Sequence, residues 1–154
     1  MMRRQKLLIP PALIWIVFAA AMWVLSVSVP VLLLKTEPHF VLPLILIAIG
    51  VIIITSCAVI FMCQKTTLNP MKPELTTTLI KTGLYQYSRN PIYLGFVIML
   101  TGWGLYLNNA PGLILVVGFI YYMNRFQIEP EEESLSRIFG TEFELYKRTV
   151  RRWL

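Results

Sequence analysis

The chain has 154 residues, a length typical of a single domain. Its residues are 56% hydrophobic and only 14% charged, which excludes an ordinary soluble domain. The net charge is +6, but the basic residues cluster at the ends of apolar runs. We therefore attribute the charge to membrane topology and expect membrane lipid, rather than nucleic acid, as a partner.

Three runs of the sequence contain no charged residue: 7–34, 40–63 and 90–124. A helix needs about 20 apolar residues to cross the hydrocarbon core of a bilayer. The third run is longer than one crossing and contains a turn cluster at 108–112, so it predicts two helices. We therefore expect an all-α integral membrane protein. Its single membrane domain, 1–154, has transmembrane helices at about 8–29, 41–62, 91–107 and 112–127.

Basic residues indicate which helix ends face the cytoplasm. They lie before the first helix, between the second and third, and after the fourth: Arg3, Arg4, Lys6, Lys65, Lys72, Lys81, Arg89 and Arg125. By the positive-inside rule, both termini are cytoplasmic. Residues 64–90 then form a cytoplasmic linker, and residues 129–154 form an amphipathic cytoplasmic tail. Within the linker, Gly83 is expected to end a short helix.

The start of the third helix carries several polar and aromatic groups. Asn90 is a favourable N-cap, and Pro91 suits the first helical position. Arg89 lies just before the first turn, while Tyr85 and Tyr93 flank it. A fixed cation beside free backbone N–H groups suits an anionic ligand. The alternative is a simple helix start with aromatic residues at the membrane interface.

The end of the fourth helix is also unusual. Arg125 lies near the membrane boundary, where it must extend to solvent or find a partner. An acidic run, 129–133, follows, and its Pro130 is expected to kink or restart the helix. Consecutive helical residues differ by about 100°, so one or two of Glu131 to Glu133 must point inward. Gly140 interrupts the tail, and Thr141 with Glu144 has the spacing of a capping box.

A hairpin of the third and fourth helices would bring these two groups together. They offer a cation for a carboxylate, carboxylates for an ammonium or ribose, and aromatic surface for a flat ring. This set fits a zwitterionic, nucleotide-like ligand such as S-adenosylmethionine. The sequence has no Gly-rich dinucleotide motif, so the site is not of the Rossmann type. We expect no metal, because His39 is alone and Cys57 and Cys63 lie about 9 Å apart on one helix.

The ordered combination of motifs resembles the isoprenylcysteine carboxyl methyltransferase family, and in particular its short bacterial members. The motifs are Gly83-x-Tyr85-x-x-x-Arg89-Asn90-Pro91-x-Tyr93-x-Gly95 and, later, Glu131-Glu132. The resemblance implies that S-adenosylmethionine is bound by Arg89, Asn90, Pro91, Tyr93, Glu131 and Glu132, with Tyr85 and Arg125 as additions. Asn90 stands where the family has histidine, and it cannot carry charge or shuttle a proton.

The resemblance implies an S-adenosylmethionine-dependent methyltransferase in the bacterial inner membrane, with its active site facing the cytoplasm. It would methylate a carboxylate, or another nucleophile, of an amphiphilic or lipid-like substrate. Arg125 is the candidate to hold the substrate carboxylate. For an amine or phenol acceptor, Glu132, or another of Glu131 to Glu133, is the candidate base. Two alternatives stay open: an NADPH-dependent reductase of the sterol-reductase type, and a non-catalytic four-helix membrane protein. The methyl acceptor and the oligomeric state are also open.

Overall fold

The computed structural model describes residues 9–29, 40–63 and 78–154, and these contain helices and irregular segments but no β-strand. The helices are α1 (Pro11–Ser28), α2 (Val41–Cys63), α3 (Pro91–Tyr106), α4 (Ala110–Met123), α5 (Glu129–Phe139) and α6 (Thr141–Thr149). The prediction of an all-α fold is therefore confirmed for these residues. Among them, α1 and α2 are long and apolar enough to cross a membrane, and α3 is a shorter apolar helix. Several residues behind the topology prediction, Arg3, Arg4, Lys6, Lys65 and Lys72, lie outside the described ranges, as does His39.

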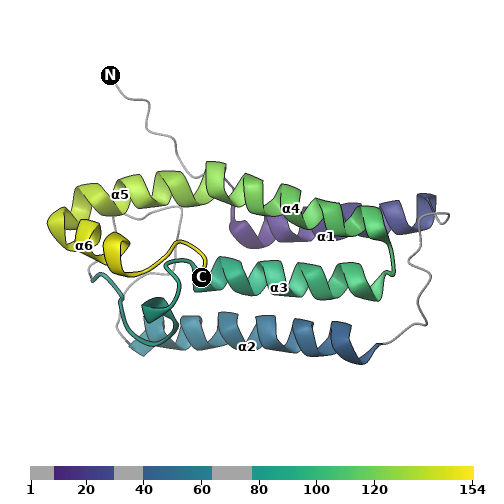
Figure 1. Ribbon diagram of the computed structural model, residues 1–154, viewed down its shortest axis with the longest axis horizontal. Coiled ribbons are helices and arrows are strands. Elements are labelled where there is room, and N and C mark those ends of the chain that lie inside the picture. Colours follow the sequence, from purple (N-terminus) through teal and green to yellow (C-terminus); the bar gives the residue numbers. More distant parts are fainter. Residues whose placement is uncertain (1–8, 30–39, 64–77) are drawn as a thin grey trace, which may run out of the picture.

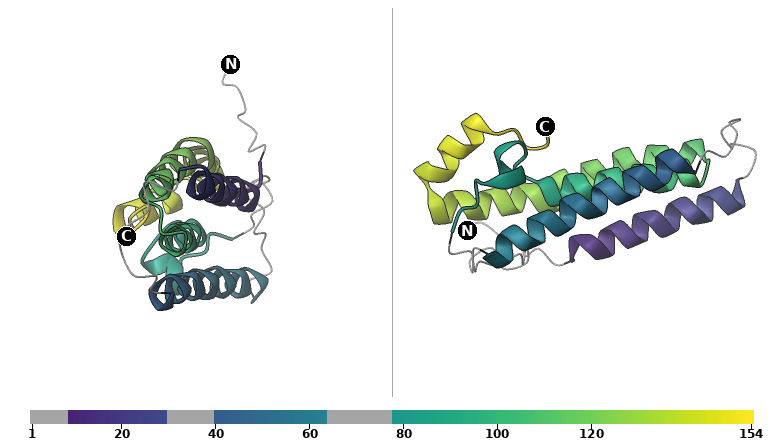
Figure 2. Two further views of the ribbon diagram at one scale, coloured as in Figure 1. Left: turned by 90° about the vertical axis from the view of Figure 1, so that its right-hand side faces the viewer. Right: turned by 90° about the horizontal axis from the view of Figure 1, so that it is seen from below.

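The four apolar helices lie side by side, with α3 between α2 on one side and α1 with α4 on the other (Figure 1; Figure 2). A core of buried side chains from α1, α3 and α4 fills the space between these three helices, among them Met22, Leu100 and Phe119. Indole N–H groups add specific links: Trp15 donates to the carbonyl of Phe96 and Trp103 to that of Ala19. The expected hairpin of α3 and α4 is present, and α1 covers both of its helices.

Helices α2 and α3 approach closely because glycines face each other across their interface. A Cβ atom added at Gly95 would lie 2.7 Å from Cγ1 of Ile54 and 3.0 Å from the carbonyl oxygen of Gly50. One added at Gly102 would lie 2.8 Å from the carbonyl oxygen of Pro43. Small residues are the usual means of close helix contact in membranes. The contact holds the start of α3, which carries Arg89 and Tyr93, at a fixed position relative to α2.

The fourth helix changes at Pro130, as predicted: α5 begins at Glu129 with Pro130 in its first turn, but the backbone stays helical up to that point. It passes through a π-helical turn, Asn124–Ile128, directly into α5, and Figure 1 shows one continuous rod. In this turn the N–H of Glu129 donates to the carbonyl of Asn124, five residues back. In a regular α-helix the proline ring would clash with the carbonyl four residues earlier. The wider turn just before Pro130 lets the helix continue, so α5 projects from the bundle in the direction of α4.

Two glycines with positive φ shape the connections on either side of the candidate site. Gly83 has a φ of 62° and begins, rather than ends, a short 3₁₀ helix, Gly83–Gln86. Gly140 has a φ of 51° and occupies the N-cap position of α6. The helix restarts at Thr141 as expected, but without the predicted capping box, because the Glu144 carboxylate binds Ser136 and Lys147 instead. The turn at Gly140 folds α6 back beneath α5 (Figure 1).

Candidate functional site

The start of α3 is held by the C-terminal end of the chain, which returns to it after α6. The N–H of Arg89 donates to the carbonyl of Arg151 at 2.9 Å. The side-chain amide of Asn90 donates to the carbonyl of Arg152 at 3.0 Å, and the N–H of Asn90 donates to the Ser88 hydroxyl at 3.1 Å. The C-terminal segment therefore supplies the hydrogen-bond acceptors for the turn that precedes α3.

These contacts correct the prediction for Asn90. The residue does occupy the N-cap position and Pro91 does begin the helix, but the Asn90 side chain makes no capping hydrogen bond. Its amide binds the C-terminal segment instead. The N–H groups of Arg89 and Asn90 are likewise engaged within the protein, so they are not part of an open anion-binding turn.

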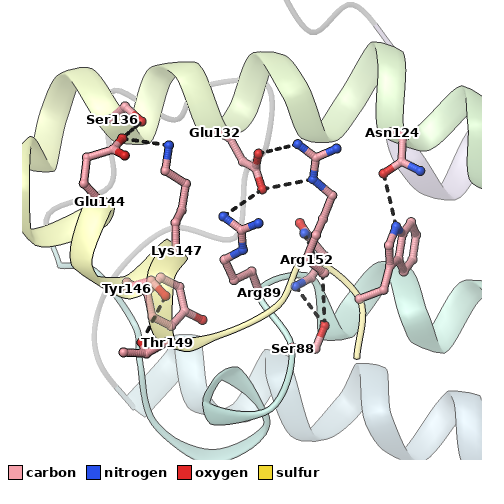
Figure 3. A network of polar contacts seen from close by, with 12 residues as sticks. Ser88, Arg89, Asn124, Glu132, Ser136, Glu144, Tyr146, Lys147, Thr149 and Arg152 are labelled. Carbon is pink, nitrogen blue, oxygen red and sulfur yellow. Dashed lines mark hydrogen bonds and ion pairs between the residues drawn. The ribbon is translucent and has the colours of Figure 1, made fainter.

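The Glu132 carboxylate lies between two arginine side chains, as Figure 3 shows. Its Oε2 atom accepts from Nη2 of Arg152 at 2.7 Å, and its Oε1 atom accepts from Nε of Arg152 at 3.3 Å. On the other side, Nη1 of Arg89 lies 3.3 Å from Oε1. The side chains of Arg89 and Glu132 are only 12% and 13% exposed. The cluster thus has two cations, one carboxylate and little solvent.

Arg89 is poorly satisfied in this arrangement. Both its Nε and its Nη1 atoms are buried and have no hydrogen-bond partner, since the Nη1 contact with Glu132 is an ion pair without hydrogen-bond geometry. A buried guanidinium donor without an acceptor costs free energy. The two free donors and the net positive charge make this position suited to an anionic group such as a carboxylate.

Glu131 lies in a second part of the site, where its neighbours are the uncharged phenols of Tyr93 and Tyr85 rather than arginines. The hydroxyl of Tyr93 donates to Oε2 of Glu131 at 2.9 Å. Burial raises the pKa of the Glu131 carboxyl from 4.5 to about 7, the Tyr93 hydrogen bond opposes this, and the charge of Glu132 adds to it. Burial is also the main reason that the pKa of the Tyr85 hydroxyl is raised, and the charge of Glu131 contributes. Tyr85, Tyr93 and Glu131 therefore act on one another electrostatically.

Aromatic and apolar side chains enclose this second part. The ring of Tyr85 packs edge-on against Phe61 of α2, with 5.8 Å between the ring centroids. The hydroxyl of Tyr146, on α6, donates to the carbonyl of Tyr85 at 2.6 Å and joins α6 to the 3₁₀ helix. Burial raises the pKa of Tyr146 to about 12, and the Arg89 guanidinium lowers it.

The structure does not bring Arg125 into this cluster, contrary to the expected grouping with Glu131 and Glu132. Its guanidinium is 62% exposed and pairs with Glu129 one turn along at 2.7 Å. Glu133 also points away, being 70% exposed and paired with Arg137. The helical spacing of about 100° per residue explains this pattern, because it turns Glu131 and Glu132 inward and leaves Glu133 outside.

Arg152 is the residue that sequence reasoning missed. The sequence places it only within the amphipathic cytoplasmic tail, 129–154. Trp153 gave a partial signal, because it continued the apolar spacing of the tail, and its indole N–H donates to Asn124 at 3.1 Å. Nothing in the local pattern indicates that the chain turns back at Gly140 and carries Arg152 to Glu132.

The amino-acid sequence of this chain is similar to those of known methyltransferases. The family model described as phospholipid methyltransferase matches residues 38–142. The protein-S-isoprenylcysteine O-methyltransferase of Saccharomyces cerevisiae is 35% identical over 79 residues, 51% of this chain and 33% of the enzyme. That of Dictyostelium discoideum is 33% identical over 75 residues, 47% of this chain and 30% of the enzyme.

A short protein of Haemophilus influenzae, described as uncharacterized, is 43% identical over 63 residues, 41% of this chain and its own full length. No solved structure is significantly similar. The segment shared with the two eukaryotic enzymes is thus about a third of their length. These similarities confirm the resemblance predicted from the motifs around Arg89 and Glu131.

Proposed function

Since this chain belongs to the phospholipid methyltransferase family of membrane methyltransferases, we propose that it transfers a methyl group from S-adenosylmethionine to an amphiphilic, lipid-like acceptor. The helices α1 to α4 would cross the bacterial inner membrane. The cluster around Glu132 would then face the cytoplasm, where S-adenosylmethionine is made.

The observation that carries the proposal is the state of Arg89. Two of its nitrogen atoms, Nε and Nη1, are buried without hydrogen-bond partners beside a carboxylate that Arg152 already satisfies. The methyl donor carries a carboxylate, an ammonium and a ribose, and the cluster offers a complement to each. Arg89 would bind the donor carboxylate, and Glu131 and Glu132 would accept hydrogen bonds from its ammonium or hydroxyl groups.

The remaining residues would support these contacts. Tyr85 and Tyr93 would present aromatic and hydroxyl surface beside Glu131. Asn90 and the buried Pro91 would fix the turn that holds Arg89, because Asn90 binds the C-terminal segment and Pro91 presets the first helical φ. We therefore keep all six residues implied by the family motif in the proposed site, but with Asn90 and Pro91 in a positioning role.

When bound, the donor supplies a methyl group activated by its sulfonium. A carboxylate acceptor is already an anion at neutral pH, so the protein needs only to align the acceptor with that methyl group. An amine or phenol acceptor must lose a proton. Glu131 is then the better base of the pair, because its pKa of about 7 lies near the working pH. The Glu132 carboxylate is already engaged by two guanidinium groups, so it is less accessible to an acceptor.

Calorimetric titration of the detergent-purified protein with S-adenosylhomocysteine, and separately with NADPH, tests the proposal. We expect micromolar binding of S-adenosylhomocysteine that Arg89→Ala and Glu132→Gln abolish. Glu133→Gln is the matched control, because Glu133 is exposed and lies outside the cluster. Binding of NADPH instead would indicate a membrane reductase, and binding of neither would indicate a non-catalytic membrane protein.

A further inference from the structure

The last residues of the chain, 150–154, form a segment that is fixed against the candidate site by its backbone. The carbonyl groups of Arg151 and Arg152 accept hydrogen bonds from Arg89 and Asn90, respectively. The indole of Trp153 binds Asn124 and packs against the core of α1, α3 and α4. None of these contacts uses the side chain of Arg152. That side chain is thus held at a defined position and is free to serve the cluster.

Of the two arginines that contact Glu132, Arg152 makes the stronger interaction. Arg152 makes two hydrogen bonds to the carboxylate, one to each oxygen, the shorter being 2.7 Å. Arg89 makes one ion-pair contact of 3.3 Å without hydrogen-bond geometry. A two-point arginine–carboxylate contact is among the strongest polar interactions in proteins. Arg152 is therefore the main hydrogen-bond donor to the Glu132 carboxylate.

The consequence concerns Arg89. Without Arg152, the weakly exposed Glu132 carboxylate would have one cation within reach, and the free donors of Arg89 would turn to it. With Arg152 in place, those donors stay available to another anion. We propose that Arg152 is a positioning residue for the methyl donor: by satisfying Glu132, it keeps the Arg89 guanidinium free to bind the donor carboxylate.

This inference rests on the proposed function, but its test separates the two. The probes are S-adenosylhomocysteine, which carries the carboxylate, and 5′-methylthioadenosine, which has the same nucleoside and thioether but no carboxylate or ammonium. A residue that serves the carboxylate changes the ratio of the two affinities. A residue that only stabilises the fold changes both affinities together.

The variants are Arg152→Ala, Arg152→Lys and, as the matched control, Arg151→Ala. Arg151 is the neighbouring residue on the same segment, its side chain is exposed, and only its backbone carbonyl contacts the site. By calorimetry, we expect Arg152→Ala to weaken S-adenosylhomocysteine at least tenfold and 5′-methylthioadenosine less than twofold. Arg152→Lys should recover part of the loss, and Arg151→Ala should bind both probes like the wild type.

Equal weakening of both probes by Arg152→Ala, or no weakening of either, would overturn the role of Arg152. Should Arg152→Ala not fold, Arg152→Gln removes the charge with less change in packing, and the same change in affinity ratio is expected. A wild-type protein that binds neither probe contradicts the proposed function itself. A wild-type protein that binds both while the ratio is unchanged in the variant contradicts only the inference.

Discussion

The Tyr93 hydroxyl donates a hydrogen bond of 2.9 Å to Oε2 of Glu131, which joins the first turn of α3 to α5. The two residues are 38 positions apart in the chain. Their contact draws a partly buried carboxylate toward a phenol rather than toward a cation. Burial raises the pKa of the Glu131 carboxyl to about 7 even though this hydrogen bond lowers it.

The raised pKa of Glu131 predicts a pH-dependent stability. In the unfolded chain this carboxyl ionises near pH 4.5, and in the folded protein near pH 7. The folded state therefore binds more protons between these values, and stability falls as the pH rises through this window. The loss amounts to about 3 kcal/mol above pH 7, by the conversion of 1.36 kcal/mol per pKa unit.

Thermal unfolding in detergent, followed by tryptophan fluorescence from pH 5 to pH 8, measures this effect. The difference in melting temperature between Glu131→Gln and the wild type should grow in favour of the variant as the pH rises through the window. Glu133→Gln is the control, because Glu133 is exposed. A difference that does not change with pH would show that Glu131 is ionised throughout.

Replacement of Gly95 tests the close contact of α2 and α3. In Gly95→Ala the new Cβ would lie 2.7 Å from Ile54 and 3.0 Å from a backbone oxygen of α2, so the helices must separate. We expect a net loss of about 1–3 kcal/mol in the free energy of unfolding. In Gly118→Ala the nearest atom is 3.6 Å away, so the better helix propensity of alanine should raise stability slightly. Equal effects of the two substitutions would contradict the packing described.

Substitution of Asn90 tests what this residue does in place of the family histidine. Asn90→Ala removes the donor to the Arg152 carbonyl and should lower the free energy of unfolding by about 1 kcal/mol. Asn90→His retains an N–H donor and should lose less. Chemical unfolding of the purified variants measures the difference. If the two variants are equally destabilised, the hydrogen bond to the C-terminal segment does not contribute.

Arg125→Ala tests the role predicted for this residue from the sequence. The side chain is exposed and lies outside the cluster, so the affinity for S-adenosylhomocysteine should be unchanged and stability should change by less than about 1 kcal/mol. Calorimetric titration of the variant measures the affinity, and thermal unfolding measures the stability, each compared with Arg89→Ala. Weakened donor binding would place Arg125 in the donor site after all. A raised KM for the acceptor alone would support the predicted contact with the substrate.

The sequence predicted the helices well because uncharged apolar runs are a local signal. The predicted helices 41–62 and 91–107 agree with α2 and α3, and each of their ends lies within one residue of the observed end. The pairing of the α3 start with Glu131 and Glu132 also followed, since a short connection forces adjacent helices to pack as a hairpin. The inward direction of these two carboxylates followed from helical spacing alone.

Other features depend on contacts between distant segments, and no local pattern reports them. The π turn before Pro130 was missed because proline signals a helix break, whereas a widened turn removes the clash. The side chain of Asn90 was assigned to its own helix, although a distant carbonyl binds it. Arg152 was invisible as a site residue, because periodicity shows which face of the tail is apolar but not which segment that face covers.

The most direct test of the central claim is transfer of tritiated methyl from S-adenosylmethionine in membranes that contain the wild-type chain or Arg89→Ala. We predict incorporation into lipid or lipidated material with the wild type and none above background with the variant. Label released by base as volatile methanol would identify a carboxylate acceptor, and base-stable label an amine or phenol. Equal incorporation in both membranes, or none in either, would contradict the assignment of a methyltransferase site at Arg89 and Glu132.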